Sequence, residues 1–370
     1  MIRTIAFYLP QFHPIPENNR WWGPGFTEWH NVARSQALFR GHRQPRQPGE
    51  LGYYDLRNED TRQEQAKLAQ EHGIDAFCYY HYWFHGKRLL ETPLERLLAN
   101  PAIDFPFCLA WANENWTRAW DGKDREMLMP QEYSSADHEA HIQYLCTVFR
   151  DPRYLRVEGC PLMVVYRPAS IPDLGQMVEL WQREARKQGF AGLHLCAVRS
   201  ISANQTEAEL QGLGFDSVID FQPNNHDFPP RNPLGKFVRL LQRTWNGFAK
   251  SRRLPQLNSV LRIDYCALRD RVTSRYQPGM LTRYPCVIPN WDNSPRKKEA
   301  TIIQSKSPRD FSEWVARAVK FVRNNPEDRQ LVFVNAWNEW AESAHLEPDQ
   351  TTGRTYLEAF RTGRAEGESQ

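Results

Sequence analysis

Two glutamates that follow an apolar run near the C-terminal end of the sequence have surroundings suited to sugar chemistry. In Leu331–Asp349 the apolar run leads into Asn338, Glu339, Trp340 and Glu342. In glycosidic chemistry one carboxyl protonates the leaving oxygen, a second acts as base or nucleophile, and flat indole faces stack on a sugar ring. The segment therefore predicts Glu339 and Glu342 as a catalytic pair. The structural alternative is a packed corner that carries a solvated acid.

Eight short apolar runs, bounded by turn or helix signals, are predicted to be strands. They are Ile5–Phe12, Ile74–Phe84, Phe105–Trp111, Pro161–Tyr166, Leu193–Arg199, Ser217–Gln222, Pro285–Trp291 and Leu331–Trp337. Helix-like stretches lie between most of them, at Thr61–His72, Pro93–Ala99, Asp137–Phe149, Leu174–Gln188 and Phe311–Asn324. This alternation predicts a (β/α)8 TIM barrel in which residues 1–370 form one catalytic domain. An open doubly wound sheet is the alternative.

Polar and aromatic residues gather after these runs, where a barrel places its functional side chains. The residues predicted to bind substrate are His13, Tyr80, His81, Trp111, Asn113, Glu114, Trp116, Arg118, Tyr166, Asn290, Trp291, Asn338, Trp340, His345 and Glu347. Each has a structural alternative, since a histidine in an aromatic strand is often a core residue. Glu114 is the rival carboxylate: if it were the acid and Glu339 the nucleophile, the chemistry would be an ordinary double displacement.

Composition limits the classes of protein that the sequence can represent. The formal charge is +3, the hydrophobic share is 41% and the chain has 13 tryptophans. No apolar run reaches about 18 residues, so no membrane span is predicted, and Met1–Thr4 leads into the first strand rather than into a secretory leader. The seven cysteines are unclustered, and five of them lie in or beside strand runs. This pattern predicts reduced thiols and a cytoplasmic location.

No cofactor, metal or nucleic-acid partner is predicted. His81 and His85 have the i, i+4 spacing of a ligand pair, but they lie on a predicted strand without a companion acid. Residues 224–283 are basic and proline-punctuated, and we interpret them as an insertion after the sixth strand. This insertion is either a solvated cover or a positively charged lid for an acidic glycan, a diphospholipid-linked sugar or a membrane surface.

Four long motifs carry a resemblance to a known family: IAFYLPQFHPIPENN with WWGPGFTEWHNV, GIDAFCYYHYWF, CLAWANENWTRAWDG and AWNEWAESAHLEPD. Together they resemble the WbsX-type family of gene clusters for O-antigen and other surface polysaccharides, over nearly the whole chain. That family is similar to glycoside hydrolase family 99, whose members are (β/α)8 barrels. The resemblance implies that Glu339 deprotonates the sugar 2-hydroxyl to give a 1,2-anhydro intermediate with net retention. It also implies that Glu342 is the acid/base at the glycosidic oxygen. Ala341 stands where the family 99 motif has histidine.

WbsX-type proteins are often labelled glycosyltransferases, so glycosyl transfer in lipopolysaccharide biosynthesis is the alternative activity. The sequence has neither an Asp-x-Asp element nor a glycine-rich loop that opens a helix. Both features are typical of nucleotide-sugar transferases, so their absence favours a retaining hydrolase or transglycosylase. We expect Glu342 to be partly protonated and Glu339 to be ionised and oriented by Asn338. A non-catalytic barrel that only binds glycan is the second alternative.

Overall fold

The central feature of the computed structural model is a closed barrel of parallel strands. The structure describes residues 1–118, 123–199, 205–230, 241, 244–246, 248, 252, 260–297 and 299–369. The barrel strands are β1 (Arg3–Tyr8), β2 (Ala76–Phe84), β4 (Phe107–Trp111), β8 (Cys160–Val165), β9 (His194–Val198), β10 (Ser217–Asp220), β12 (Thr282–Val287) and β15 (Leu331–Val334). Their spatial order is β1-β15-β12-β10-β9-β8-β4-β2, and pairing of β1 with β2 closes the ring. The predicted TIM barrel is confirmed.

The strands form where the apolar runs are, because parallel strands covered on both faces need nearly continuous apolar sequence. Strands β4, β9 and β15 are buried throughout their lengths. Strands β2 and β4 end at the predicted residues, whereas the other six barrel strands end before their predicted runs do. For example, β1 ends at Tyr8 and β15 at Val334. The residues beyond these ends leave the sheet and form the rim of the barrel.

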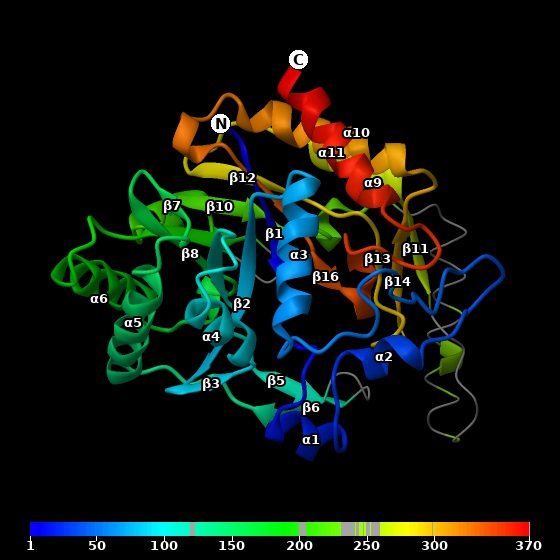
Figure 1. Cartoon of the computed structure of the whole chain (residues 1–370), viewed down its shortest axis with the longest axis horizontal. Coiled ribbons are helices and arrows are strands. Elements are labelled where there is room, and N and C mark those ends of the chain that lie inside the picture. The colour runs from blue at the N-terminus through cyan, green and yellow to red at the C-terminus, as the bar shows by residue number, and fades with distance from the viewer. Residues whose placement is uncertain are drawn as a thin grey trace.

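Helices cover the outside of the barrel (Figure 1). They are α3 (Glu59–Glu71), α4 (Thr92–Ala99), α5 (Ser135–Phe149), α6 (Leu174–Lys187), α7 (Glu207–Gly212), α9 (Tyr265–Thr273), α10 (Pro308–Val322) and α11 (Thr355–Ser369). Capping explains where several of them begin: the Ser134 side chain accepts a hydrogen bond from Asp137 N, and Ser307 forms a capping box with Asp310. Helices α10 and α11 pack closely because Gly363 has no side chain to meet the backbone oxygen of Ser312.

Shorter elements are built onto the barrel between its strands and helices. They are α1 (Pro16–Trp22), α2 (Trp29–Ala33), β3 (Lys87–Leu89), β5 (Trp116–Arg118), β6 (Lys123–Met129), β7 (Arg156–Val157), η2 (Pro168–Ser170), η3 (Asn225–Asp227), β11 (Leu261–Asp264), β13 (Trp291–Asp292), β14 (Thr301–Gln304), η4 (Glu327–Arg329), β16 (Asn338–Glu339), η5 (Trp340–Glu342) and β17 (Ala344–His345). In Figure 1, α1 and the β5–β6 hairpin lie at the opposite end of the barrel from the two chain termini. The predicted site residues follow the strands toward that end.

The basic stretch 224–283, predicted to be an insertion after the sixth strand, is described only in part. Its residues 231–240, 242–243, 247, 249–251 and 253–259 lie outside the described residues, and with them Arg239, Arg243, Lys250 and Arg253. Its last part forms β11, which pairs with β14, and α9, which lies in sequence between barrel strands β10 and β12 and contacts α10. Helix α9 therefore belongs to the outer cover of the barrel.

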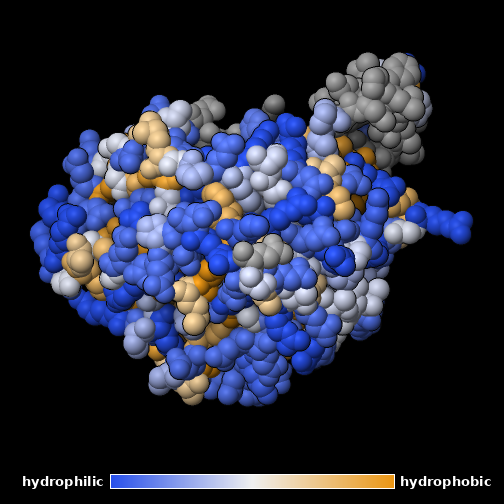
Figure 2. Space-filling model, turned by 90° about the horizontal axis from the view of Figure 1, so that it is seen from above, coloured by the Kyte–Doolittle hydropathy of each residue, from blue (hydrophilic) through white to orange (hydrophobic). Residues whose placement is uncertain are grey.

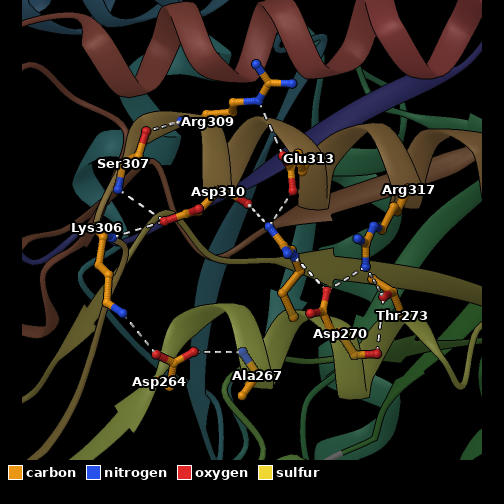
Figure 3. Close-up of polar contacts among 11 residues, drawn as sticks. Asp264, Ala267, Asp270, Thr273, Lys306, Ser307, Arg309, Asp310, Glu313 and Arg317 are labelled. Atoms are coloured by element: carbon orange, nitrogen blue, oxygen red, sulfur yellow. Dashed lines mark hydrogen bonds and ion pairs between the residues drawn. The ribbon is translucent and has the colours of Figure 1, made fainter.

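Charged residues of α9 and α10 neutralise one another across their contact (Figure 3). Arg269 donates to Glu313 at 2.7 Å, Arg317 donates to Asp270 at 2.7 Å, and Asp264 caps α9 through the backbone of Ala267. Acids of the protein itself thus pair with these arginines. The lid role of the insertion stays a prediction.

The surface seen from above in Figure 2 is mainly hydrophilic, with apolar residues in scattered patches. Across the described ranges, no helix combines the length and the apolar character that crossing a bilayer requires. Five cysteines are buried and two are half-buried, and all seven are free thiols. Cys160 is half-buried at the start of β8, and Cys146 in α5 is buried.

Candidate active site

A cavity of about 640 Å³ opens at the C-terminal ends of the barrel strands, and both predicted catalytic glutamates line it. Its walls come from all around the rim: Leu9, Gln11, Asn18, Trp22, Tyr80, Tyr82, Ala112, Glu114, Asn115, Trp116, Thr117, Leu128, Tyr166, Arg167, Phe221, Pro223, Asn225, Phe228, Trp291, Asn293, Arg296, Lys297, Glu299, Thr301, Asn335, Glu339 and Glu342. Aromatic faces alternate with polar groups, which is the mixture that binds sugar rings and their hydroxyls.

Arg296 joins the two glutamates at the cavity wall. Its Nη2 lies 3.2 Å from Glu339 Oε2, and its Nη1 lies 3.1 Å from Glu342 Oε1. One planar guanidinium thus faces both carboxyls, so the two acids are close neighbours on the same wall of the cavity. Arg296 follows β13 in a long loop, and it was not among the predicted site residues.

Glu28 is a third carboxylate on the same arginine. Its Oε1 accepts from Arg296 Nε at 2.8 Å, and its side chain is fully buried. The residue is the N-cap position of α2, and the next residue, Trp29, packs against Trp340 with ring centroids 5.5 Å apart. The loop that carries Glu28 is therefore fixed to the loop that carries Glu339.

The pKa of Glu339 is raised to about 8, chiefly because the side chain is buried. Arg296 lowers this pKa, while the negative charges of Glu342 and Glu28 raise it. The expectation of an ionised Glu339 at neutral pH is therefore wrong in direction, since burial among like charges favours its protonated form. Burial also raises the pKa of Glu28. One cation faces three carboxyls, so the cluster favours retention of a proton.

Asn338 fixes the backbone before Glu339 rather than orienting its carboxyl. Its Oδ1 accepts from Leu9 N at 2.7 Å, and its Nδ2 donates to Leu9 O at 3.1 Å and to Tyr54 Oη at 3.3 Å. These bonds join β16 to the end of β1, which is how the first strand positions a glutamate that follows the last one. Asn338 is buried and lies outside the cavity wall.

Glu347 supports the same loop from behind. Its carboxylate accepts from Trp340 Nε1 at 2.6 Å, Tyr54 Oη at 2.8 Å and Gln65 Nε2 at 2.6 Å. Burial raises its pKa to about 7, and these donors act in the opposite direction. Trp340 in turn stacks on His345 at 3.8 Å. Three predicted substrate ligands are thus buried behind the cavity and do not line it: Trp340, His345 and Glu347. Their polar atoms contact one another, since Trp340 Nε1 donates to the Glu347 carboxylate and His345 Nδ1 lies 3.0 Å from Glu347 O.

Five of the predicted substrate-binding residues line the cavity: Tyr80, Glu114, Trp116, Tyr166 and Trp291. Glu114 is half exposed and pairs with Arg167 Nε at 2.8 Å. Its pairing with Arg167 suits a carboxylate that binds hydroxyls. Tyr80 and Tyr166 pack edge to face, with ring centroids 6.2 Å apart.

His81 and Trp111 point away from the cavity. The His81 Nε2 lies 2.9 Å from His141 Nε2 in α5, and the Trp111 ring packs on His141 and on Trp181 of α6. Burial lowers the pKa of His81 to about 3. Neighbouring side chains alternate between the faces of a strand, so Tyr80 and Tyr82 face the cavity while His81 faces the helices. These two predictions of substrate contact are corrected accordingly.

The remaining predicted residues position rim loops. Asn113 accepts from Arg167 N and donates to Arg167 O, and Arg118 pairs with Glu126 at 2.7 Å. Asn290 accepts from Ser305 N at 3.1 Å. His13 is buried and its pKa is lowered to about 4 by that burial. None of these four is among the cavity-lining residues of the described chain, because each is directed into a loop or the core.

Arg296 and Glu28 are the residues of the candidate site that sequence reasoning missed. Glu28 lies in the motif WWGPGFTEWHNV, where a carboxylate between aromatic residues was a usable signal. Arg296 lies in SPRKKE, where nothing distinguishes it from a solvated basic run.

Comparison with known sequences places almost the whole chain in one family model. Residues 4–360 match the model described as Glycosyltransferase WbsX. Proteins from two strains of Xanthomonas campestris pv. campestris, both described as "Uncharacterized protein WxcX", are 43% identical over 359 residues. The alignment covers 96% of this chain and 49% of each relative, so the chain spans about half the length of the curated relatives it matches.

Comparison with solved structures identifies similar barrels. A GH99 endo-alpha-mannosidase from Bacteroides thetaiotaomicron, in complex with BIS-TRIS-propane, has a TM-score of 0.57 and 12% identity, over 100% of this chain and 98% of that chain. A structure described as a glycoside hydrolase-like protein has a TM-score of 0.56 and 13% identity, over 98% and 93% of the two chains. At these identities the likeness establishes the fold, and function has to be argued from the site.

Proposed function

The chain belongs to the Glycosyltransferase WbsX family, as its motifs predicted, and on that premise we propose that it cleaves glycosidic bonds in a bacterial surface polysaccharide. The proposed reaction is an endo-type hydrolysis with retention at the O-antigen or a related glycan. The observation that carries the proposal is the pair Glu339 and Glu342, held by one guanidinium at the wall of an aromatic-lined cavity. Two adjacent carboxyls of this kind supply both proton transfers that glycoside cleavage needs.

In the first proposed step, Glu339 takes the proton from the sugar 2-hydroxyl, and the O2 atom of that hydroxyl attacks C1. The bond from C1 to the leaving oxygen breaks, and Glu342 donates a proton to that oxygen. In the second step, Glu342 takes a proton from water, the water oxygen attacks C1, and the bond between C1 and O2 breaks as Glu339 returns its proton. The two inversions at C1 give net retention.

The raised pKa of Glu339 suits a base for an alcohol. Its pKa of about 8 makes the ionised carboxylate a stronger proton acceptor than an ordinary glutamate, because base strength increases with the pKa of the conjugate acid. The cost is that the protonated form of Glu339 is favoured at pH 7. Increasing pH therefore favours the proton transfer to Glu339, and the rate increases with pH only as long as Glu342 keeps the proton that it donates.

Glycosyl transfer is the alternative that the family description favours. The same two steps give transfer when a sugar hydroxyl replaces water as the second attacking group. A non-catalytic glycan-binding barrel is the second alternative, and it requires both glutamates to be dispensable.

Incubation of the purified protein with the host's surface polysaccharide in ¹⁸O-water, followed by mass spectrometry of the released sugars, tests the proposal. Hydrolysis predicts one ¹⁸O atom at each new reducing end. Transfer predicts unlabelled products of altered length when an acceptor glycan is added. Binding without either product would leave only the non-catalytic barrel.

We also propose a peripheral contact with anionic membranes, where a lipid-linked glycan would be met, and a cytoplasmic location, which the free thiols support. The residues Leu241, Trp245 and Phe248 are 54%, 44% and 44% exposed, in a stretch of sequence rich in lysine and arginine. Exposed indole, phenyl and leucyl groups beside basic residues suit the bilayer interface. Cosedimentation with vesicles that contain anionic lipid should be lost in the L241S/W245S/F248S variant.

A further inference from the structure

Glu28 is a fully buried acidic residue that forms an ion pair with Arg296. Its side chain is 0% exposed, and its carboxylate accepts from Arg296 Nε at 2.8 Å. It does not line the cavity, so a substrate in the cavity would not touch it. Burying a carboxylate without a functional need is costly, since the ion loses its hydration.

The three contacts of Arg296 occupy three different corners of the guanidinium. Nε faces Glu28, Nη2 faces Glu339 and Nη1 faces Glu342. Since the guanidinium is planar and rigid, the bond at Nε fixes the direction in which both Nη atoms point. Without Glu28 the group is free to turn about its side-chain torsions and to pair both Nη atoms with a single glutamate, as bidentate arginines do.

From this geometry we propose that Glu28 is a positioning residue for the reaction, acting through Arg296 to hold Glu339 and Glu342 in separate contacts and to set their shared charge. The proposal rests on the function proposed above. It assigns Glu28 a role in orientation and in charge balance, while the two cavity-lining glutamates transfer the protons.

The charge balance involves every ionisable group around Glu339. Burial dominates its pKa, Arg296 lowers it, and Glu342 and Glu28 raise it. The charge of Glu339 also raises the pKa values of Tyr80, Tyr82 and Tyr166. The remaining charged groups of the cavity wall are Glu114, Arg167, Lys297 and Glu299. Glu28 contacts Arg296 from outside the cavity, whereas Glu339 and Glu342 contact it from the cavity wall.

The loop that carries Glu28 is rigidly attached to the glutamates it serves. Trp29 donates from Nε1 to Tyr54 O at 2.8 Å and packs on Phe12 and Trp340. Tyr54 in turn contacts Asn338 and Glu347, the two residues that support the Glu339 loop. A displacement of Glu28 is thus resisted by the same contacts that position the catalytic pair.

Three variants of the full chain test the proposal: Glu28→Gln removes the charge and keeps the shape, and Glu28→Asp keeps the charge and retracts the carboxylate. Asp349→Asn is the matched control, because Asp349 forms a buried ion pair with Arg46 at 2.8 Å. The titration midpoint of the Glu339 carboxyl is measured without substrate, by carbon NMR of protein with carboxyl-labelled glutamate. The Glu339 signal is assigned as the one that is lost in Glu339→Gln. The pH dependence of kcat and KM is measured where the wild type turns over.

In Glu28→Gln we expect the Glu339 titration midpoint to fall by roughly one pH unit. The reason is that a like charge is removed and that Arg296 then shares its charge between Glu339 and Glu342 only. In Glu28→Asp we expect a midpoint within about half a unit of wild type and a kcat reduced at least tenfold with little change in KM. Asp349→Asn should leave the midpoint unmoved.

An unchanged Glu339 midpoint in Glu28→Gln would overturn the proposal, whatever happens to the rate. A rate loss that is uniform across pH, with that midpoint unmoved, would show a merely structural role. If the wild type itself neither cleaves nor transfers glycan, the proposed function fails, while the NMR titration still decides whether Glu28 sets the charge of Glu339.

Discussion

Replacing Arg296 by glutamine should test the charge cluster most severely, because this residue provides the cation for three carboxyls. It faces Glu28 at 2.8 Å, Glu339 at 3.2 Å and Glu342 at 3.1 Å. Loss of an opposite charge at such distances raises a carboxyl pKa by roughly 1–3 units. The pKa of Glu339, already about 8, should therefore rise further.

The effect on activity follows from the fraction of ionised base. Each unit of rise lowers the ionised fraction of Glu339 about tenfold below its pKa, so Arg296→Gln should lose about 10- to 1,000-fold in kcat/KM at pH 7. Part of the loss should be recovered as the pH is raised, since the carboxylate is then restored. The assay is initial rate against pH from 6 to 10, with wild type and Arg296→Lys in parallel.

The loss of stability in Arg296→Gln should increase with pH, whereas the loss of activity should decrease. A buried carboxyl whose folded pKa is raised stabilises the fold while protonated, and this contribution is lost as pH increases through the folded pKa. Breaking a buried ion pair costs about 3–5 kcal/mol, and proton uptake by the cluster offsets part of that cost at pH 6. Arg296→Gln should thus lower the melting temperature more at pH 9 than at pH 6. A loss of activity or of stability that is equal at all pH values would refute this reasoning.

Other changes should separate binding, support and packing. Trp291→Ala should raise KM with kcat changed only a few fold, in steady-state kinetics, because Trp291 offers a face to the substrate rather than a proton. Glu347→Ala should lose about 1–3 kcal/mol in chemical denaturation, because it leaves the donors of Trp340 and Tyr54 without their acceptor. Gly363→Ala should cost about 1–3 kcal/mol by the same measurement with activity retained in the folded fraction, since a Cβ there would lie 2.2 Å from Ser312 O.

The barrel was predictable because apolar runs and helical periodicity are local properties. Each of the eight predicted runs overlaps a barrel strand, and five of the runs contain the whole strand. Helix α11 was not predicted because its interface with α10 depends on glycines, which are weak helix formers, at Gly363 and Gly367. Helix α9 was hidden in the basic stretch, since its arginines find acidic partners on α10 only in three dimensions.

The site was predictable only where the chemistry-bearing residues directly follow a strand. Glu339 and Glu342 follow β15 and lie on the cavity wall, whereas His81 lies on the other face of β2 and contacts α5. Strict alternation along the strand would have separated His81 from Tyr80. Arg296 reaches the glutamates from a loop beyond β13, and its identity as their counterion depends on long-range packing that no local pattern records.

The central claim is that Glu339 and Glu342 together carry the chemistry, and it is tested most directly by the rate of glycan release in Glu339→Gln, Glu342→Gln and Glu114→Gln. Removing either general catalyst should lower kcat about 10²- to 10⁴-fold, whereas Glu114→Gln should act mainly on KM. Abolished turnover in Glu114→Gln with turnover intact in Glu342→Gln would contradict the account and make Glu114 the acid.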